Sequence, residues 1–562
     1  MLQLSALPSM DASAEELGTD SLVAVEIRSW FLDELMVDVP VLKILGGATV
    51  AGMVDLAIEK LPMELIPMVQ RSSAPTSSSD SEPTLPSNAS STSKSSSEDM
   101  AEDVLSTPST EMSFNLGDTR KELMSYGQSR FWILGAMLED PTAFNIVFVI
   151  QLTGEIDGEK LSWAFRQITH RHSALRTRFD DSDEEPLQEI LAEPAFQLKQ
   201  RKISSREDVS KEFARLKARE YDLVNGELMD ISLLSQSSSQ HFLAIGYHHI
   251  NLDSMSLQNL LRDLDKAYRG VSLGPKALQY IDHSTRQRRA FNKGQMNKEL
   301  AYWKKEFPDL PPVLPLLPYS KVRARQSRTS YAHNRVDVKI PASVAKSIKA
   351  ACTKYRISPF HFHMATFKTL LARVLEIDDL CIGMTDANRT DLDELGSIGL
   401  YLNMLPLRFR QLGSQLFAES VKETQSKVRN SLANSRLPFD VLIEQLKPER
   451  SMKYSPIFQA FIDYKPPIDN KPDLFKCALG DEEYDVGQTA YDIVLSIVDD
   501  TKDPVVSFQL QSSLYSQEES ERLTRSYMWL LQQFSANPDS SLDSVSLHNP
   551  IDMEEAIQKS RG

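Results

Sequence analysis

The chain has little cysteine, no long hydrophobic run and a deficit of positive charge. Its 562 residues include three cysteines (Cys352, Cys381 and Cys477), which are too few and too scattered for a disulfide framework or a Cys-x-x-Cys metal site. No run approaches the ~18 apolar residues of a membrane span, and no signal peptide begins the chain. With 62 basic and 78 acidic residues, the net charge of −16 argues against a general nucleic-acid surface. We therefore expect a soluble, cytoplasmic protein that binds neither membranes nor nucleic acid.

Aromatic residues are also missing from one long stretch, since none occurs between Leu32 and Ser113. Within it, residues 72–97 contain 13 serines in 26 positions. Such a segment cannot bury enough apolar surface to offset its ordering entropy, so it should be a flexible tether. The predicted organisation is a small module (1–63), a Ser-rich linker (64–112), a large globular module divided at residue 315 (113–315 and 316–548), and a tail (549–562).

The large module mixes strand and helix patterns, and we predict an α+β fold. Residues 144–152, 241–247 and 380–384 are rich in β-branched and other apolar residues typical of buried strands. An amphipathic pattern predicts a helix over 256–268. A second helix is predicted over 358–375, with Ser358 as its N-cap and Pro359 at its first position. The five prolines of 307–320 predict an extended crossing between two α+β lobes.

The most specific local pattern is YHHINLDSMSL at 247–257, between a predicted strand and a predicted helix. Histidine has a usual pKa of ~6.5, which suits proton transfer near neutral pH, and loops after buried strands often carry catalytic groups. His249 is therefore our candidate catalytic residue. The pattern leaves alternatives open, because tandem histidines can be packing residues and Asp253 with Ser254 can simply cap the helix.

A metal site at these histidines is not expected. His170, His172 and His283 have no ligand spacing with the pair, and the cysteines are distant. His361 and His363 lie on an apolar helix, where packing is the more common role.

In the small module, LGTDSLVAVEIRSWFLDEL (17–35) places a turn before an amphipathic helix with Leu22, Val25, Leu32 and Leu35 on its inner face. Ser21 lies at the positive end of that helix, where backbone N–H groups and the helix dipole can stabilise a phosphodiester. The spacing alone favours a simpler interpretation, in which Asp20 and Ser21 cap the helix.

The segments LGTDSLVAVEIRSWF (17–31) and VDVPVLKILGGATVAGMV (37–54) resemble the C-terminal part of an acyl carrier protein from fungal highly reducing polyketide synthases. The resemblance implies that Ser21 carries 4′-phosphopantetheine. Only some fifteen residues precede the motif, which leaves no room for the family's first helix. We therefore expect a partial carrier on which Ser21 is not loaded.

Seven ordered segments of the large module resemble the condensation domain of nonribosomal peptide synthetases. They are SYGQSRFWIL (125–134), RHSALRTRF (171–179), YHHINLDSMS (247–256), YIDHSTRQ (280–287), IGLYLNMLPLRF (398–409), RLPFDVLIEQL (436–446) and YSPIFQAFIDY (454–464). The resemblance implies a V-shaped pseudo-dimer of two chloramphenicol-acetyltransferase-like lobes. Together with the carrier resemblance, it implies the junction of a fungal polyketide–nonribosomal peptide hybrid synthase.

This resemblance implies a reaction and a set of roles. An acyl thioester on a polyketide carrier would react with the amine of an aminoacyl thioester on a second carrier, each held by a phosphopantetheine arm. His249 would take the amine proton or steady the oxyanion. His248 would be structural, and Asp253 would hold the loop by pairing with Arg171 or Arg176.

Two departures from the family pattern leave other functions open. Ser254 replaces the family's glycine, and His283 with Ser284 replaces aromatic and small apolar residues. The first alternative is a stand-alone acyltransferase that forms an ester or amide with a free alcohol or amine. The second is a non-catalytic remnant or scaffold of a hybrid synthase. Heterocyclisation is disfavoured because the two histidines are not replaced by aspartates.

Overall fold

A computed structural model of the protein describes residues 9–61 with gaps, most of 120–549, and residues 553, 554 and 557. The gaps in the large module are 181–184, 329, 411–414, 450, 466–472 and 500–503. Ser21 and the predicted linker at 64–112 lie outside the described residues. The same holds for Leu22, Val25 and Leu32 of the predicted inner helix face.

The first half of the large module is built on a five-stranded sheet in the order β12-β2-β7-β6-β5. Helices α6 and α8 pack on one face of the sheet and α7 on the other, because alternate residues of β2 point to opposite sides. The strands are β2 (Asn145–Thr153), β5 (Leu198–Lys202), β6 (Met229–Ser235), β7 (Gln240–His248) and β12 (Ala478–Asp485). The helices are α6 (Gly158–Arg171), α7 (Arg206–Lys217) and α8 (Ser254–Arg269).

The second half is built on a six-stranded mixed sheet in the order β10-β9-β11-β13-β14-β8. Its helices pack on it through a large apolar core to which α11, α12, α14 and α16 all contribute. The strands are β8 (His333–Lys339), β9 (Asp379–Asp386), β10 (Asn403–Arg410), β11 (Ala460–Lys465), β13 (Ile493–Val498) and β14 (Val505–Gln511). The helices are α11 (Ala342–Tyr355), α12 (Pro359–Leu375), α14 (Phe417–Leu432) and α16 (Gln517–Ala536).

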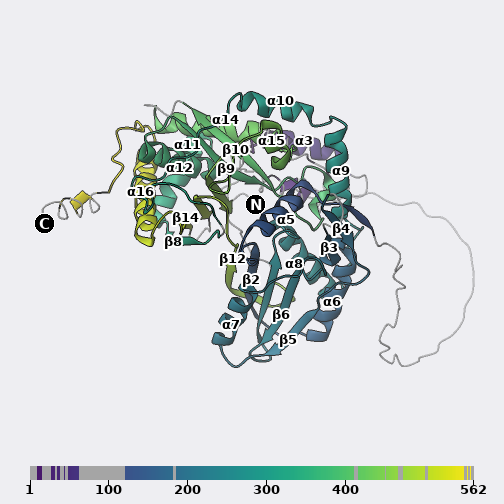
Figure 1. Ribbon diagram of the computed structural model, residues 1–562. Helices are drawn as coiled ribbons and strands as arrows, with labels where there is room; N and C mark the ends of the chain where they lie inside the picture. Colours follow the sequence, from purple (N-terminus) through teal and green to yellow (C-terminus); the bar gives the residue numbers. More distant parts are fainter. Residues whose placement is uncertain are drawn as a thin grey trace, which may run out of the picture.

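Shorter elements complete the two halves of the module. They are α5 (Tyr126–Met137), η1 (Ser173–Arg176), α9 (Tyr280–Asn292), α10 (Asn297–Glu306), α13 (Leu392–Leu395) and α15 (Phe439–Leu446). A small sheet in the order β1-β4-β3 comprises β1 (Lys121–Leu123), β3 (Thr177–Asp180) and β4 (Leu187–Ile190). Figure 1 shows the two sheets, each with its own helices, as separate lobes.

One strand crosses between the halves. Strand β12 comes late in the chain, yet it pairs antiparallel with β2 and completes the first sheet, with Asp485 opposite Val147. Figure 1 shows it in the yellow-green of the later residues beside the blue of β2. One strand of the first sheet, β12, therefore comes from the part of the chain after the predicted lobe boundary at residue 315.

The local predictions agree with the observed elements. The strands predicted at 144–152, 241–247 and 380–384 are β2, β7 and β9, and the helices predicted at 256–268 and 358–375 are α8 and α12. Ser358 is the N-cap of α12 and accepts a hydrogen bond from the backbone of His361, with Pro359 in the first turn. Residues 307–320 contain neither helix nor strand.

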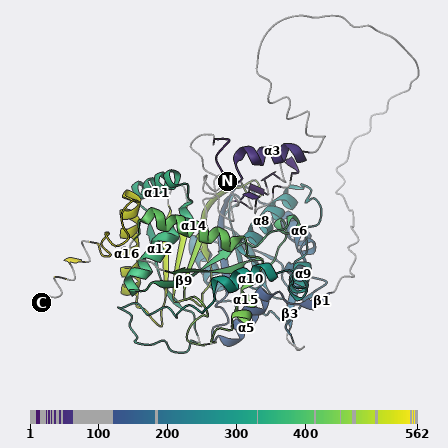
Figure 2. The same ribbon diagram turned by 90° about the horizontal axis from the view of Figure 1, so that it is seen from above.

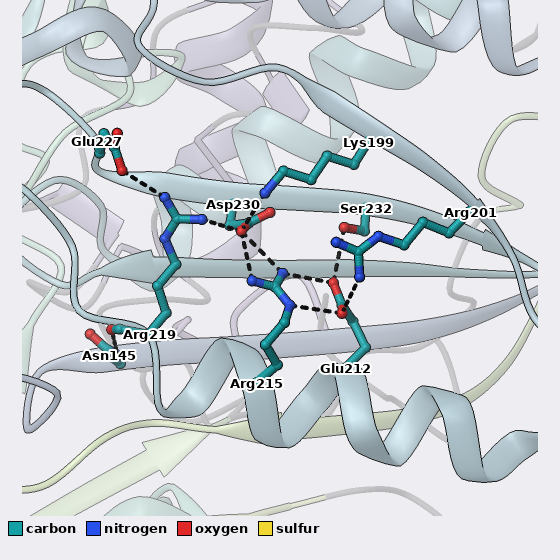
Figure 3. Close-up of polar contacts among 9 residues, drawn as sticks. All are labelled: Asn145, Lys199, Arg201, Glu212, Arg215, Arg219, Glu227, Asp230 and Ser232. Carbon is teal, nitrogen blue, oxygen red and sulfur yellow. Dashed lines mark hydrogen bonds and ion pairs between the residues drawn. The ribbon is translucent and has the colours of Figure 1, made fainter.

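A cluster of charges fixes α7 to the first sheet (Figure 3). The buried carboxylate of Asp230 on β6 accepts hydrogen bonds from Lys199, Arg215 and Arg219, and Glu212 on α7 contacts Arg215. Burial alone would raise the pKa of Asp230, but the three cations hold it below its usual value. The cluster therefore keeps a buried carboxylate ionised and binds the helix to the sheet.

The small module has a core of its own. The described residues between Ala24 and Leu35 are helical, and α3 (Val50–Lys60) follows them. Ala24, Ile27, Met53 and other buried residues form a separate apolar cluster. Among the helices that the structure describes, none is long and apolar enough to cross a membrane.

Loss of the Asp230 charge should destabilise the first lobe. Asp230→Ala removes the carboxylate that neutralises Lys199, Arg215 and Arg219. Because the three cations then lack this partner, we expect the free energy of unfolding to fall by ~3–5 kcal/mol. Chemical denaturation followed by circular dichroism measures the change. Asp481→Ala is the control, because its exposed pair with Arg206 should contribute under ~1 kcal/mol, and an equal loss in both variants would contradict this role.

Candidate active site

His249 lies in the turn that directly follows β7. At this end of the sheet, β7 pairs with the start of β2. The register of the two strands places His248 opposite Asn145, and the backbone N–H of His249 donates to the carbonyl of Phe144 at 2.9 Å. The ring of Phe131 on α5 packs against the His249 ring with 5.0 Å between centroids. The imidazole is therefore held between the central strand and α5, and it stays partly exposed.

The hydrogen bond of the His249 ring identifies its tautomer. Nδ1 lies 2.9 Å from the carbonyl oxygen of Leu252, and a carbonyl can only accept, so Nδ1 carries the proton. Burial lowers the pKa of His249 below its usual value, which keeps the ring neutral near pH 7. In a neutral ring with the proton on Nδ1, Nε2 has a free lone pair. Nε2 is therefore available as a base.

His248 has a different environment from its neighbour. Its ring is buried, Nδ1 accepts a hydrogen bond from the backbone N–H of Ile250 at 3.2 Å, and the ring packs edge-on against Phe144. Burial lowers the pKa of His248 to about 3. It is a neutral packing residue over the whole physiological range, which supports the structural role expected for it.

Asp253 combines two functions that the sequence left as alternatives. Its Oδ1 caps α8 by accepting from the backbone of Ser256 at 2.8 Å, and the same oxygen accepts from Nη2 of Arg389 at 3.1 Å. Its Oδ2 accepts from the backbone N–H of Tyr401 at 2.9 Å. The carboxylate is 3% exposed. It therefore ties the histidine loop of the first lobe to the segment that leads into β10 of the second.

The predicted arginine partner of Asp253 was wrong. Arg171 lies at the end of α6, where it donates to backbone carbonyls around Gly274 and lies 3.6 Å from Asp263. Arg176 donates to the carbonyl of Leu191. Both side chains face connections within the first lobe, whereas Asp253 at the start of α8 faces the second lobe.

The observed partner, Arg389, follows β9 and was missed from the sequence. Its guanidinium also donates to the carbonyl of Ser397 at 2.8 Å and to Oγ of Ser256 at 2.7 Å, and it stacks over the ring of Tyr401. The only available signal was its place in a loop after a buried strand. Its partner is 136 residues away, which no local pattern identifies.

The departures from the family pattern have structural explanations. Ser254 is the first helical residue of α8 and is exposed, so its backbone does not require glycine. The buried His283 binds Glu394 through Nδ1 at 2.7 Å, and Oγ of Ser284 donates to the carbonyl of Leu123. These two residues join α9 to α13 and to β1.

A cavity of about 430 Å³ lies between the lobes. Most of its lining is apolar, and it includes Met404, Phe439 and Ile443. One wall carries an ion pair, in which Arg130 of α5 contacts Asp440 of α15 at 2.8 Å. The guanidinium of Arg130 lies over the ring of Phe131, the same ring that packs on His249. Phe131 therefore contacts both an arginine of the cavity wall and His249, although neither Phe131 nor His249 lines the cavity itself.

Three further histidines are hydrogen-bonded to ordinary partners. His172 contacts Asp263 at 2.8 Å, Nδ1 of His361 contacts the N-cap Ser358, and His363 contacts the hydroxyl of Tyr527 at 2.8 Å. Burial lowers the pKa of both His361 and His363 to about 3. Within the described part of the chain, no three His, Cys, Asp or Glu side chains are grouped as a metal site would require.

Comparison with protein families and solved structures confirms the predicted fold of the large module. The family model of the condensation domain matches residues 120–556. The solved condensation domain of the monacolin K polyketide synthase MokA is 30% identical, with a TM-score of 0.71, and the match covers 75% of this chain and 99% of that one.

Curated relatives match almost the whole chain. The hybrid PKS-NRPS synthetase traA of Penicillium crustosum is 38% identical over 98% of it, and the polyketide synthase-nonribosomal peptide synthetase ffsA of Aspergillus flavipes is 36% identical over 100%. The chain spans 16% of the length of each of these relatives.

Breaking the Asp253–Arg389 pair should destabilise the protein strongly. Asp253→Asn keeps an N-cap for α8 but removes the charge, which leaves the buried guanidinium uncompensated, so we expect a loss of ~3–5 kcal/mol. Arg389→Met should cost a similar amount. The double variant should lose less than the sum, as measured by urea unfolding of all three.

A nearby exposed pair provides the control for this cycle. Asp393→Asn removes the partner of Arg286, and because both side chains are exposed the expected change is under ~1 kcal/mol. Strictly additive losses in the Asp253 and Arg389 variants would show that the two residues do not act as a pair.

Proposed function

The chain belongs to the condensation-domain family, and on this basis we propose that it is an acyltransferase that forms an amide from a polyketide acyl thioester and an aminoacyl thioester. The observation that carries the proposal is the state of His249. Its Nδ1–H is bound to the carbonyl of Leu252, which leaves a neutral ring with the lone pair of Nε2 free. A base of this kind is what aminolysis of a thioester requires.

The proposed reaction is a direct attack of the amine on the thioester, and the protein forms no covalent bond to either substrate. The amine nitrogen attacks the thioester carbonyl, and Nε2 of His249 accepts a proton from that nitrogen. The carbon–sulfur bond then breaks, and Nε2–H returns the proton to the departing sulfur. The products are an amide and a free thiol.

The tautomer favours the base role over initial stabilisation of the oxyanion. Before the reaction Nε2 has no hydrogen to donate to a developing oxyanion, because the proton of the neutral ring is on Nδ1. Once Nε2 has taken the amine proton, the imidazolium can donate it. The carbonyl of Leu252 continues to accept from Nδ1 in both states.

Both reactants would reach His249 on phosphopantetheine arms, which belong to the substrates. We propose an acyl carrier domain of a polyketide synthase and a peptidyl carrier domain as the partners that hold them. Tethering turns a bimolecular reaction into an effectively unimolecular one, which can contribute ~7 kcal/mol or more. The expectation that Ser21 carries no arm stays a prediction, because that residue lies outside the described part of the chain.

We propose that the cavity between the lobes accommodates the acyl chain. A reduced polyketide chain is apolar along its length, and the lining of the cavity is mostly apolar. Its volume of about 430 Å³ falls in the range of small-molecule sites. The Arg130–Asp440 pair lies in its wall, next to the ring that packs on His249.

Removal of the His249 imidazole should abolish most of the activity. We expect His249→Ala to lower kcat/KM for amide formation by ~10²–10⁴-fold, as loss of a general base does, with a thermal unfolding midpoint close to that of the wild type. The assay supplies an acyl-pantetheine thioester and an aminoacyl carrier and detects the amide by mass spectrometry. Ser254→Gly is the matched control and should retain activity, because Ser254 is exposed at the start of α8, whereas the His249 ring is held by Leu252 and Phe131. A folded His249→Ala variant with more than a tenth of wild-type activity would contradict the base role.

Filling the cavity should select against long acyl chains. Ile443→Trp adds bulk to the lining, so we expect kcat/KM to fall by about tenfold or more for a long-chain acyl thioester and to stay near wild type for an acetyl thioester. The conservative Ile443→Leu variant provides the control. Equal losses for both acyl donors would show that the acyl chain binds elsewhere.

A further inference from the structure

A buried arginine of the small N-terminal module contacts the condensation domain. Arg28 lies in the helical segment between Ala24 and Leu35, and it is only 4% exposed. Its Nη1 donates to the backbone carbonyl of Thr390 at 2.6 Å. In Figure 2, the purple elements of this module, α3 among them, lie against the domain. An arginine is seldom buried without a partner, so its position indicates a specific contact.

The segment that Arg28 contacts is acidic. Asp391 caps α13, and Asp393 and Glu394 follow it within that helix. Partial desolvation and the neighbouring carboxylates raise the pKa of Asp391, whereas Arg436 and, to a smaller extent, Arg28 act in the opposite direction. A cation from the small module is therefore placed where the domain concentrates negative charge.

The acidic segment also contacts the loop that carries His249, through Arg389. Thr390 directly follows Arg389, whose guanidinium binds Asp253 at the end of the histidine loop. The backbone N–H groups of Thr390 and Asp391 both donate to Oε2 of Glu394 at 3.1 Å. Two backbone hydrogen bonds to one carboxylate therefore hold the turn, and the carbonyl that accepts from Arg28 belongs to the residue next to Arg389.

We propose that residues 389–395, the acidic turn, are a docking surface for the small N-terminal module of the same chain, and that Arg28 is its positioning residue. The segment that docks is the one that holds Arg28, whose described residues between Ala24 and Leu35 are helical. Through Arg389 the acidic turn couples docking of this module to the geometry of the His249 loop. The importance of the His249 loop for activity rests on the proposed function, but the docking contact does not.

Hydrogen exchange of the full-length protein tests the docking directly. We expect Arg28→Ala to speed exchange in peptides that cover 388–398 by roughly tenfold, because a charge-assisted hydrogen bond to the turn is lost. Lys43→Ala, which removes an exposed cation of the same module, should leave these peptides unchanged. Equal exchange in the wild type and Arg28→Ala would overturn the proposal.

A second pair of variants covers the case in which Arg28→Ala unfolds the small module. Asp391→Asn keeps the cap of α13 but removes the charge near Arg28, and Asp393→Asn removes a neighbouring exposed charge that pairs with Arg286. We expect Asp391→Asn, but not Asp393→Asn, to speed exchange in peptides that cover 24–35. If neither variant affects those peptides, the acidic turn is not the docking surface.

Hydrogen exchange at several protein concentrations distinguishes docking within one chain from docking between two copies. An amide-formation assay distinguishes failure of the docking proposal from failure of the proposed function. Protection of 24–35 that is independent of protein concentration supports docking within one chain, whereas protection that is lost on dilution would assign the surface to a second copy and overturn the proposal. Failure of the proposed function would appear as no amide from any variant. That result would leave the exchange pattern unaffected.

Discussion

The buried pair of Asp253 and Arg389 is the interaction on which the active site depends. Its two charges come from different lobes, and each is satisfied by further hydrogen bonds, to Tyr401 and Ser256 on one side and to Ser397 on the other. Burial makes such a pair costly to break. Because Asp253 follows Leu252, the pair also fixes the carbonyl that holds Nδ1 of the histidine. The Asp253 carboxylate thus helps to fix which nitrogen of the His249 ring carries the hydrogen.

Close packing supports the same connection between the lobes. The segment that contains Gly399 lies so close to Tyr280 that a Cβ on Gly399 would be 1.9 Å from the ring. The hydroxyl of Tyr280 donates to the carbonyl of Leu400, and His283 stacks against Tyr280. The histidine that departs from the family pattern is therefore part of the contact between α9 and the second lobe. Its Nδ1 is hydrogen-bonded to Glu394 of α13.

The sequence predicted what depends on neighbouring residues and failed where distant segments meet. Strand β7, helix α8 and the histidine turn between them follow from local periodicity and capping, and so does the start of α12 at Ser358. Arg171 was proposed as the partner of Asp253 only from the family motif, whereas the observed Arg389 depends on how the two lobes pack. The position of β12 was missed for the same reason, since nothing in its own residues specifies β2 as its neighbour.

Strand β12 also constrains the order in which the chain can fold. During synthesis β2 and β7 can pair early, because the chain between them is already complete. The outer edge of β2 stays without its partner until residues 478–485 have emerged, which is after most of the second lobe has been made. An unpaired strand edge is a site for misassociation in slowly completed proteins. The sheet of the first lobe therefore cannot be completed before β12 has been synthesised, so the finished first lobe depends on a late part of the chain.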